Sequence, residues 1–374
     1  MKEKVRKVAA ACLGACLAVL CCACGSSFEG YVDNDVDYRS VMQASGQSNG
    51  HKIGVSMPDK ELQRWAQDGS NIKTQLSDAG YTVDLQYAGN DASMQDSQVN
   101  NMIDGGCEIL VIAAIDSEAL TDSLDNAKES GVTVISYDRL ITGSDAVSYY
   151  ASFDNRLVGE LQGEYIENAL DLKNTDGPYH IELFTGSPDD NNCNFFFGGA
   201  MDVLQPYIEE GKLIVTSGQM TKEECSTKGW STDRAKKRME SILKDYYSDG
   251  TKLDAVLASN DSVARGVAEA LMENGKDDFP VLTGQDCDIN SVKNIINGKQ
   301  SMSVFKDTRQ LAEKAVEMIE AVLNGKEVPV NDTSSYDNGT GIIPSYLCGP
   351  VFADKENYKE ILIDSGYYEA EQLQ

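Results

Sequence analysis

The feature that most constrains this chain is a repeated alternation of short apolar runs with helical patterns, which starts near His51. The run at 52–57 predicts a strand, and 59–79 carries apolar residues at the spacing of an amphipathic helix. Later strand-like runs are rich in Val and Ile without strict alternation, as is typical of strands buried on both faces. This order of elements predicts an α/β fold with doubly wound parallel sheets.

The alternation forms two series of similar size, separated by a strand predicted at 148–153. Other strands are predicted at 82–88, 109–114, 132–138, 179–185, 213–218, 255–259, 280–284 and 301–305, each followed or preceded by a helical pattern. A chain of 374 residues is long enough for two α/β domains of ordinary size. Two similar lobes are therefore expected.

Residues 1–24 have the features of an export signal. A basic start precedes an apolar run at 8–23, which is shorter than the ~20 residues that a membrane span needs. Cys24 is followed by Gly, Ser and Ser, which resembles bacterial lipoprotein signals, in which such a cysteine is lipidated. The polar stretch 25–50 predicts a flexible tether. We expect a protein secreted across the cytoplasmic membrane and lipid-anchored at the outer face of the cell membrane or in the periplasm.

Charge and motifs argue against several function classes. The net charge of −28 repels phosphate backbones, so no nucleic-acid partner is expected. Zinc-type Cys/His spacings and Gly-rich phosphate loops do not occur, so no metal and no cofactor is expected. One GxSxG run, at 46–50, falls in the predicted tether and not between a strand and a helix. The protein is not expected to be an enzyme.

Polar residues follow six of the predicted strands directly, where ligands of open α/β sheets bind. They are Asp138-Arg139, Asp154-Asn155, the run 186–192, Asn260-Asp261, Gln285-Asp286 and Lys306-Asp307. Asp and Asn are also common helix caps. Arg139 and Lys306 are poor caps, however, so a convergent polar site explains the whole set better.

The chemistry of this set suits a polyhydroxylated ligand. A sugar hydroxyl both donates and accepts hydrogen bonds, and carboxylates, amides and guanidinium groups match it. The two tryptophans, Trp65 and Trp230, each lie near one polar cluster, where a flat ring can stack on the apolar face of a pyranose. Ordinary packing is the alternative for both rings. We therefore predict a polyhydroxylated, sugar-like ligand.

These motifs resemble the periplasmic xylose-binding and multiple-monosaccharide-binding proteins, which are type I periplasmic binding proteins of ABC importers. The resemblance extends from about residue 51 to the C-terminus and rests on the runs 137–141, 152–155, 186–192, 259–261, 284–286 and 304–306. It implies two Rossmann-like lobes joined by a three-segment hinge near 152–154, 304–306 and 328–333. The N-terminal lobe would be 51–153 plus 306–329, and the C-terminal lobe 154–305 plus part of 330–374.

The resemblance also implies ligand-binding roles, to which the reasoning above adds Trp65. The predicted ligand-binding residues are Arg64, Trp65, Asp138, Arg139, Asp190, Asn192, Trp230, Asn260, Asp286 and Lys306. The stretch 221–229 departs from the family pattern, which leaves the role of Trp230 open.

The function implied is capture of a monosaccharide of the xylose, glucose, galactose or arabinose type by a monomer that delivers it to an ABC transporter permease. A sugar sensor that presents its ligand to a chemoreceptor or sensor kinase is the main alternative. A sugar-responsive regulator would need a DNA-binding head, which residues 1–50 do not provide. Asp189-Asp190 could suit a glycosidase, but the two-lobe pattern disfavours one.

Overall fold

The first half of the chain supplies most of a six-stranded sheet in which every neighbouring pair is parallel, in the order β11-β5-β4-β3-β1-β2. Its strands are β1 (Lys52–Met57), β2 (Thr82–Tyr87), β3 (Ile109–Ile112), β4 (Thr133–Tyr137), β5 (Val147–Phe153) and β11 (Ser345–Cys348). The computed structural model describes residues 49–275 and 278–374, all within one compact unit. Cys24, with the predicted signal and nearly all of the predicted tether, lies outside these ranges.

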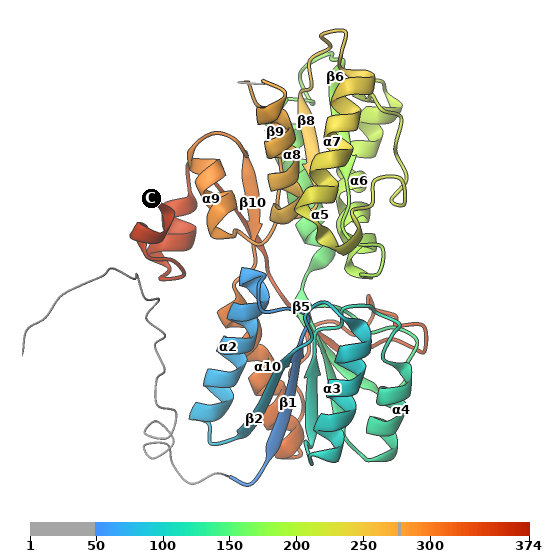
Figure 1. Cartoon of the computed structure of the whole chain (residues 1–374), viewed down its shortest axis with the longest axis vertical. Helices are drawn as coiled ribbons and strands as arrows, with labels where there is room; N and C mark the ends of the chain where they lie inside the picture. Colours follow the sequence, from blue (N-terminus) through green and yellow to red (C-terminus); the bar gives the residue numbers. More distant parts are fainter. Residues whose placement is uncertain (1–48, 276–277) are drawn as a thin grey trace, which may run out of the picture. The chain divides into compact units, whose positions relative to one another are not determined.

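Helices cover both faces of this first sheet (Figure 1). On one face, α2 (Gln63–Asp78) and α10 (Thr308–Leu323) pack through buried apolar side chains such as Ile72 and Leu311. On the other, α3 (Ala92–Asp104) and α4 (Thr121–Glu129) pack in the same way. Strands covered on both faces explain the nearly continuous apolar runs of the sequence.

A second, four-stranded sheet has the order β7-β6-β8-β9 and is also parallel throughout. Its strands are β6 (Tyr179–Phe184), β7 (Leu213–Val215), β8 (Ala255–Ala258) and β9 (Val281–Leu282). Helices α5 (Asn155–Ala169) and α6 (Asn192–Glu209) cover one face, and α7 (Thr232–Tyr246) and α8 (Asp261–Glu273) the other. The predicted α/β fold with doubly wound parallel sheets is confirmed.

The C-terminal part of the chain forms a small third region. Strand β10 (Met302–Phe305) pairs antiparallel with β12 (Val351–Asp354), and α9 (Ile289–Ile296) packs beside them. The short helical turns η2 (Lys359–Asp364) and η3 (Ala370–Leu373) complete its core. Neither β11 nor β12 was predicted, because four-residue strands without a β-branched run give little local signal.

The chain connects the first sheet and its helices to the rest of the fold three times. Two connections, at Asp154 and at Lys306-Asp307, coincide with the expected segments. The third runs from β11 to β12 through Gly349. The segment 328–333, where a connection was expected, lies against the first sheet, because its apolar side chains pack on that core and its end pairs with Ser345.

Several helices start at a residue whose side chain accepts a hydrogen bond from a backbone N–H of the first turn. These caps are Asp91, Asp154, Ser231, Asn260, Asp288 and Asp307. Such caps satisfy amides that the helix itself leaves unpaired. Three of the strand-end polar residues of the sequence, Asp154, Asn260 and Asp307, are therefore caps.

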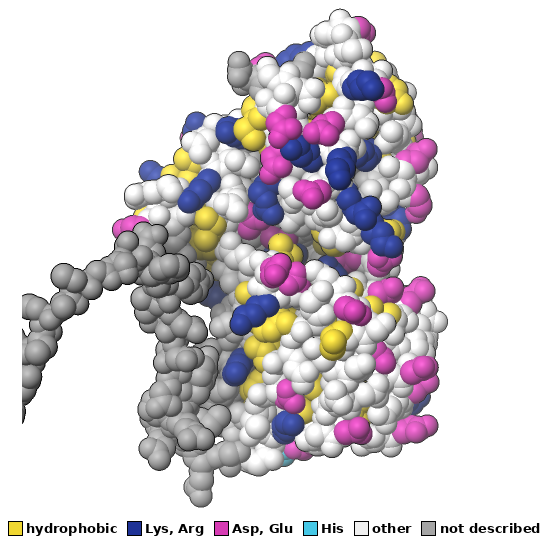
Figure 2. Space-filling model, viewed as in Figure 1, with side chains coloured by type: hydrophobic (Ala, Val, Ile, Leu, Met, Phe, Trp, Pro, Cys, Tyr) yellow, Lys and Arg dark blue, Asp and Glu magenta, His cyan; other side chains and the backbone are white. Residues whose placement is uncertain are grey.

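Charged side chains of both signs cover the face seen in Figure 2, where basic ones gather over the region of α7. Arg234, Lys237 and Lys244 on this helix are exposed. Within the described ranges, no helix is both long and apolar enough to cross a membrane. The five cysteines of these ranges are buried and free.

Candidate functional site

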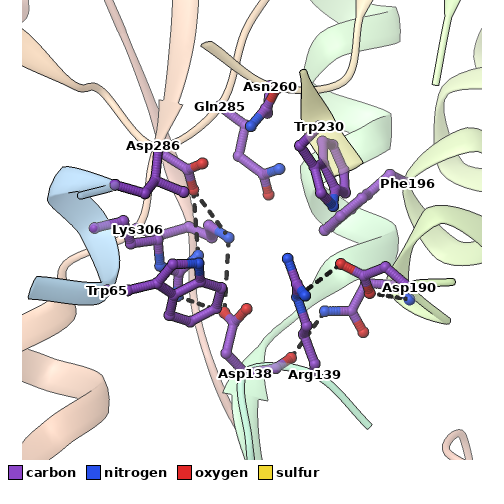
Figure 3. Close-up of a pocket in the computed structure, with 13 residues that line it drawn as sticks. Trp65, Asp138, Arg139, Asp190, Phe196, Trp230, Asn260, Gln285, Asp286 and Lys306 are labelled. Atoms are coloured by element: carbon purple, nitrogen blue, oxygen red, sulfur yellow. Dashed lines mark hydrogen bonds and ion pairs between the residues drawn. The ribbon is translucent and has the colours of Figure 1, made fainter. Parts of the chain in front are cut away.

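One pocket collects every predicted ligand-binding residue (Figure 3). Its lining consists of Leu62, Arg64, Trp65, Asp138, Arg139, Asp190, Asn192, Phe196, Trp230, Asn260, Gln285, Asp286 and Lys306. About 340 Å³ of space not occupied by atoms lies among these residues, a volume that includes open solvent. Leu62, Phe196 and Gln285 also line the pocket but were not predicted as ligand-binding residues, although Gln285 was named among the strand-end polar residues.

The turn after β4 places two of these side chains. Asp138 has a φ of 58°, in the left-handed region that non-glycine residues seldom adopt. Its backbone carbonyl accepts hydrogen bonds from Tyr150 Oη (2.6 Å), Ser152 Oγ (2.8 Å) and Asn192 Nδ2 (2.8 Å). Three donors on one carbonyl hold this strained backbone in place, and with it the directions of the Asp138 and Arg139 side chains.

Arg64, in the first turn of α2, is the centre of a buried ionic network. Its Nε donates to Asp68 Oδ2 (3.0 Å), Nη1 donates to Asp286 Oδ1 (3.2 Å), and Nη2 donates to Asp138 Oδ2. Lys306 Nζ lies 3.1 Å from Asp286 Oδ1 and 3.7 Å from Asp138 Oδ2. The guanidinium and the ammonium therefore share the same two carboxylates.

The pKa values in this network follow from burial and from charge together. Burial acts to raise the pKa of Asp138, but Arg64, Lys306 and Arg139 outweigh it and lower that pKa below its ordinary value. Burial likewise acts to lower the pKa of Arg64, and the surrounding carboxylates raise it well above its ordinary value. Both groups are charged at neutral pH.

Arg139 forms a second buried pair. Its Nε lies 2.9 Å from Asp190 Oδ2, and its Nη1 donates to the carbonyls of Ala114 (3.1 Å) and Ile115 (3.2 Å). Burial raises the pKa of Asp190, although Arg139 opposes that rise. The guanidinium carbons of Arg139 and Arg64 each lie 5.1 Å from the centre of the Trp65 ring. Trp65 is therefore both core packing and a wall of the pocket.

Neutral side chains line the remainder of the pocket. The side-chain amide of Asn192 has a protein neighbour at both ends, since its Nδ2 donates to the Asp138 carbonyl and its Oδ1 lies 3.1 Å from Tyr150 Oη, whose single proton is shared with that carbonyl. The Oδ1 of Asn260 accepts from the backbone N–H of Val263 (3.0 Å) as the cap of α8. Both residues line the pocket as predicted, but much of their hydrogen-bonding capacity is already committed to the protein.

Two polar atoms of the pocket lining differ in their hydrogen bonding from those of Asn192 and Asn260. Among the described residues, Gln285 Oε1 and Trp230 Nε1 are buried and have no hydrogen-bond partner. Figure 3 shows the Gln285 side chain directed into the pocket. Buried polar atoms are nearly always paired in native proteins, so two unpaired atoms here are natural contacts for a polar ligand.

The position of Trp230 depends on a glycine that is far away in the sequence. A Cβ on Gly186 would come within 2.0 Å of the Trp230 ring, so only glycine leaves room for the indole. Trp230 itself has a φ of 54° and packs edge-on against Phe196. The structure therefore places Trp230 in the pocket even though the preceding stretch 221–229 departs from the family pattern.

The charged groups of the site are paired with one another. Arg64, Arg139 and Lys306 face the carboxylates of Asp68, Asp138, Asp190 and Asp286, and every one of these groups lies in at least one ion pair. A ligand with a full charge would have to compete with these internal pairs. A neutral ligand that donates and accepts hydrogen bonds fits without disturbing them.

Comparison with known proteins identifies the family. Residues 53–327 match the model of the periplasmic binding protein domain. The chain belongs to this family. The multiple sugar-binding periplasmic receptor ChvE of Rhizobium radiobacter is 49% identical over 325 residues, covering 86% of this chain and 92% of that protein. The D-xylose-binding periplasmic protein of Escherichia coli is 36% identical, with 86% and 92% covered. The resemblance predicted from the motifs is confirmed.

Solved structures agree with this family assignment. An ABC transporter solute-binding protein from Clostridium phytofermentans with bound β-D-glucose is 60% identical, with a TM-score of 0.85 and 86% of this chain and 100% of that chain covered. A carbohydrate transporter solute-binding protein from Chloroflexus aurantiacus, in complex with D-glucose, is 32% identical, with a TM-score of 0.78 and 86% and 98% covered. The type I fold predicted for this binding protein is confirmed.

The residues that the sequence analysis missed in this binding protein gave signals of different strength. Gln285 was named with Asp286 as a strand-end polar residue and stands inside the motif 284–286, so it could have been predicted to bind the ligand as well. Asp68 lies four residues after Arg64, a spacing that places two side chains on one face of a helix. Phe196 is one of three consecutive phenylalanines on α6, and no local pattern shows which of them faces a pocket.

Proposed function

We propose that this protein binds one monosaccharide, in its pyranose form, in the pocket of Figure 3. The observation that carries the proposal is the combination of internally paired charges with unpaired polar atoms on Trp230 and Gln285. The paired groups supply fixed donors and acceptors for hydroxyls without attracting a charged ligand. The rings of Trp65 and Trp230 supply flat apolar walls for the C–H faces of a sugar.

We infer that the sugar is D-glucose or a close aldopyranose such as xylose, galactose or arabinose. Two solved relatives, 60% and 32% identical to this chain, carry glucose, and curated relatives are named for xylose or for several sugars. These names describe the relatives. They support a panel of these monosaccharides as the first ligands to test.

Binding without catalysis is the expected activity. A glycosidase needs one carboxyl group that can give up a proton and a second one that is free to act on the sugar. The described carboxylates that line the pocket are each paired with a cation, and the exposed Asp189 does not line it. Incubation with aryl glycosides should therefore yield no released aglycone.

We further propose that the protein delivers its sugar to an ABC importer and is held at the membrane by a lipid on Cys24. The family assignment supports the importer role. The Cys-Gly-Ser-Ser run supports lipidation. Replacing Cys24 with Ser should move the protein from the membrane fraction to the soluble fraction, and a variant that stays in the membrane fraction would disprove the anchor.

We also propose that the two predicted lobes, 51–153 with 306–329 and 154–305 with part of 330–374, close on the sugar. Lining residues follow strands of both sheets, so one ligand can contact both lobes. A ligand that contacts both favours the closed arrangement by its difference in affinity for the two states.

Calorimetric titration of residues 25–374 with a panel of free monosaccharides tests the proposal directly. At least one aldopyranose should bind to a single saturable site. Arg139→Lys should lower its affinity at least about tenfold, because Lys cannot hold Asp190 and two carbonyls at once as the planar guanidinium does. The matched control is Arg234→Lys on the exposed face of α7, which should bind like the wild type. No binding of any monosaccharide would refute the proposal.

A further inference from the structure

Asp68 is a buried carboxylate beside the pocket whose role the proposed function does not explain. It lies on α2, one turn after Arg64, and its side chain is 0% exposed. It does not line the pocket, so a sugar in the pocket would not touch it. Burying a carboxylate is costly unless its oxygens are paired.

Both oxygens of Asp68 are paired with residues of the site or its immediate neighbours. Oδ2 accepts from Arg64 Nε (3.0 Å), and Oδ1 accepts from Tyr137 Oη (2.6 Å). Tyr137 is the last residue of β4 and directly precedes Asp138. Asp68 therefore ties the helix that carries Arg64 to the strand that carries Asp138.

We propose that Asp68 is a positioning residue that holds the guanidinium of Arg64 in the orientation in which it faces Asp138, Asp286 and the sugar. The inference rests on the proposed function, because it concerns the same pocket. A guanidinium has a flat fork of donors, and fixing Nε fixes the plane of the other two nitrogens. With Nε held by Asp68, Nη1 and Nη2 are directed toward Asp286 and Asp138.

The surroundings of Asp68 make its charge dependent on pH. Burial, with a smaller contribution from the nearby Asp138, raises the pKa of Asp68 to about 6 against the opposing effect of Arg64. Tyr137 donates to this carboxyl group, and Tyr87 on β2 and Tyr367 near the C-terminus are close enough to interact with its charge. Below about pH 6 the group becomes neutral, and its hydrogen bond to Arg64 loses the assistance of charge.

Affinity and stability should respond to this titration in opposite directions. Because the pKa is raised in the folded state, the stability that Asp68 contributes is fully present below its ordinary pKa and is lost as pH rises through about 6. The orientation of Arg64, and with it the affinity for sugar, should improve over the same rise in pH. If Asp68 had a purely structural role, sugar affinity and folding stability would not change in opposite directions as the pH rises.

Asp68→Asn tests the inference, because asparagine has the same shape and no charge. We expect the affinity for D-glucose to fall about tenfold at neutral pH, and the unfolding temperature of the sugar-free protein to stay the same or rise. Calorimetric titrations from about pH 5 to 8 should show weaker binding at acid pH for the wild type and a flatter profile for the variant.

The matched control is Glu182→Gln. Glu182 is an equally buried carboxylate on β6, bonded to Ser217 and Tyr247, and it does not line the pocket. This change should alter the unfolding temperature and leave sugar affinity as in the wild type. Arg64→Lys combined with Asp68→Asn should bind no more weakly than Arg64→Lys alone, because Asp68 acts through the guanidinium.

Each result has a distinct meaning. If the wild type binds glucose and Asp68→Asn binds it equally well, the positioning role is refuted and the proposed function stands. Strictly additive losses in the double variant, or a loss of stability with intact affinity, also refute the positioning role. If the wild type binds none of the monosaccharides in the panel, both proposals fail.

Discussion

The two sides of the pocket are built from different chemistry (Figure 3). On the side of the first sheet, Arg64 and Arg139 are cations that neighbouring residues hold rigidly. The side of the second sheet is mostly neutral, but it contributes the carboxylates of Asp190 and Asp286, which pair with those two cations across the pocket. Among the described residues that line the pocket, the buried polar atoms without a hydrogen-bond partner, Trp230 Nε1 and Gln285 Oε1, lie on this second side.

This difference separates two tasks. Buried ion pairs are expensive to break, so the side of the first sheet, the charged side, maintains the geometry of the pocket. The side of the second sheet, the neutral side, has unpaired hydrogen-bonding atoms that can bind the hydroxyls of a ligand. Changes on the charged side should therefore affect stability and affinity together, whereas changes on the neutral side should affect affinity alone.

The largest expected effect comes from Asp138→Ala, which removes the carboxylate that Arg64 and Lys306 share. Leaving buried cations without this partner should lower the free energy of unfolding by about 3–5 kcal/mol, and sugar binding should be lost. Urea denaturation measures the first effect and calorimetry the second. An unchanged free energy of unfolding would show that the charged side of the pocket does not maintain its geometry.

The stability that Asp138 contributes should depend on pH in a definite direction. Because its pKa is lowered in the folded state, the stability it contributes is present above the ordinary pKa of aspartate. That stability is lost as pH falls through the lowered value. The difference in unfolding free energy between wild type and Asp138→Ala should therefore shrink in acid.

Asp286→Asn should have a smaller effect that falls mainly on binding. The Asp286 side chain is 14% exposed. When the charge of Asp286 is removed, Arg64 and Lys306 still have Asp138 as a partner. We expect sugar affinity to fall about tenfold with little change in unfolding temperature. Asp189→Asn, at an exposed aspartate that does not line the pocket, is the control and should behave like the wild type. A large drop in unfolding temperature for Asp286→Asn would assign Asp286 to the maintenance of the fold.

Trp230→Phe tests the neutral side by removing one donor while keeping a ring. The loss of the unpaired Nε1 donor should weaken binding a few-fold, about 0.5–1.5 kcal/mol, without destabilising the sugar-free protein. Gly186→Ala should lower affinity at least as much, because its Cβ displaces the indole. Gly198→Ala on α6, where a Cβ meets only an ordinary contact at 3.5 Å, is the matched control. Equal affinity for all four proteins would mean that the indole does not contact the sugar.

The smallest expected effect is a change of shape on binding. Saturating sugar should reduce the radius of gyration measured by small-angle scattering, because one ligand would contact both sides of the pocket. The change should be modest, since the Arg64–Asp286 and Arg139–Asp190 pairs already join the two sides. A radius that does not change at saturation would argue against closure of the lobes.

Local patterns were sufficient to predict the elements that place the site. Runs of Val and Ile indicated the buried strands, and polar residues directly after them, such as Asp138 and Lys306, indicated the edge at which a pocket forms. These features are readable because the burial of a strand and the position of its end depend on neighbouring residues. All ten residues predicted for the site accordingly line one pocket.

The tertiary structure alone decided what each polar group does there. Asn260 caps a helix, Asn192 is bound to the turn after β4, and Asp68 lies behind Arg64 without facing the pocket. Strand β11 joined the first sheet although its sequence gave no strand signal. The physical reason is distance along the chain, because pairs such as Arg64 with Asp286 join segments separated by 222 residues. No local pattern specifies such a contact, and only the packing of the whole fold brings its partners together.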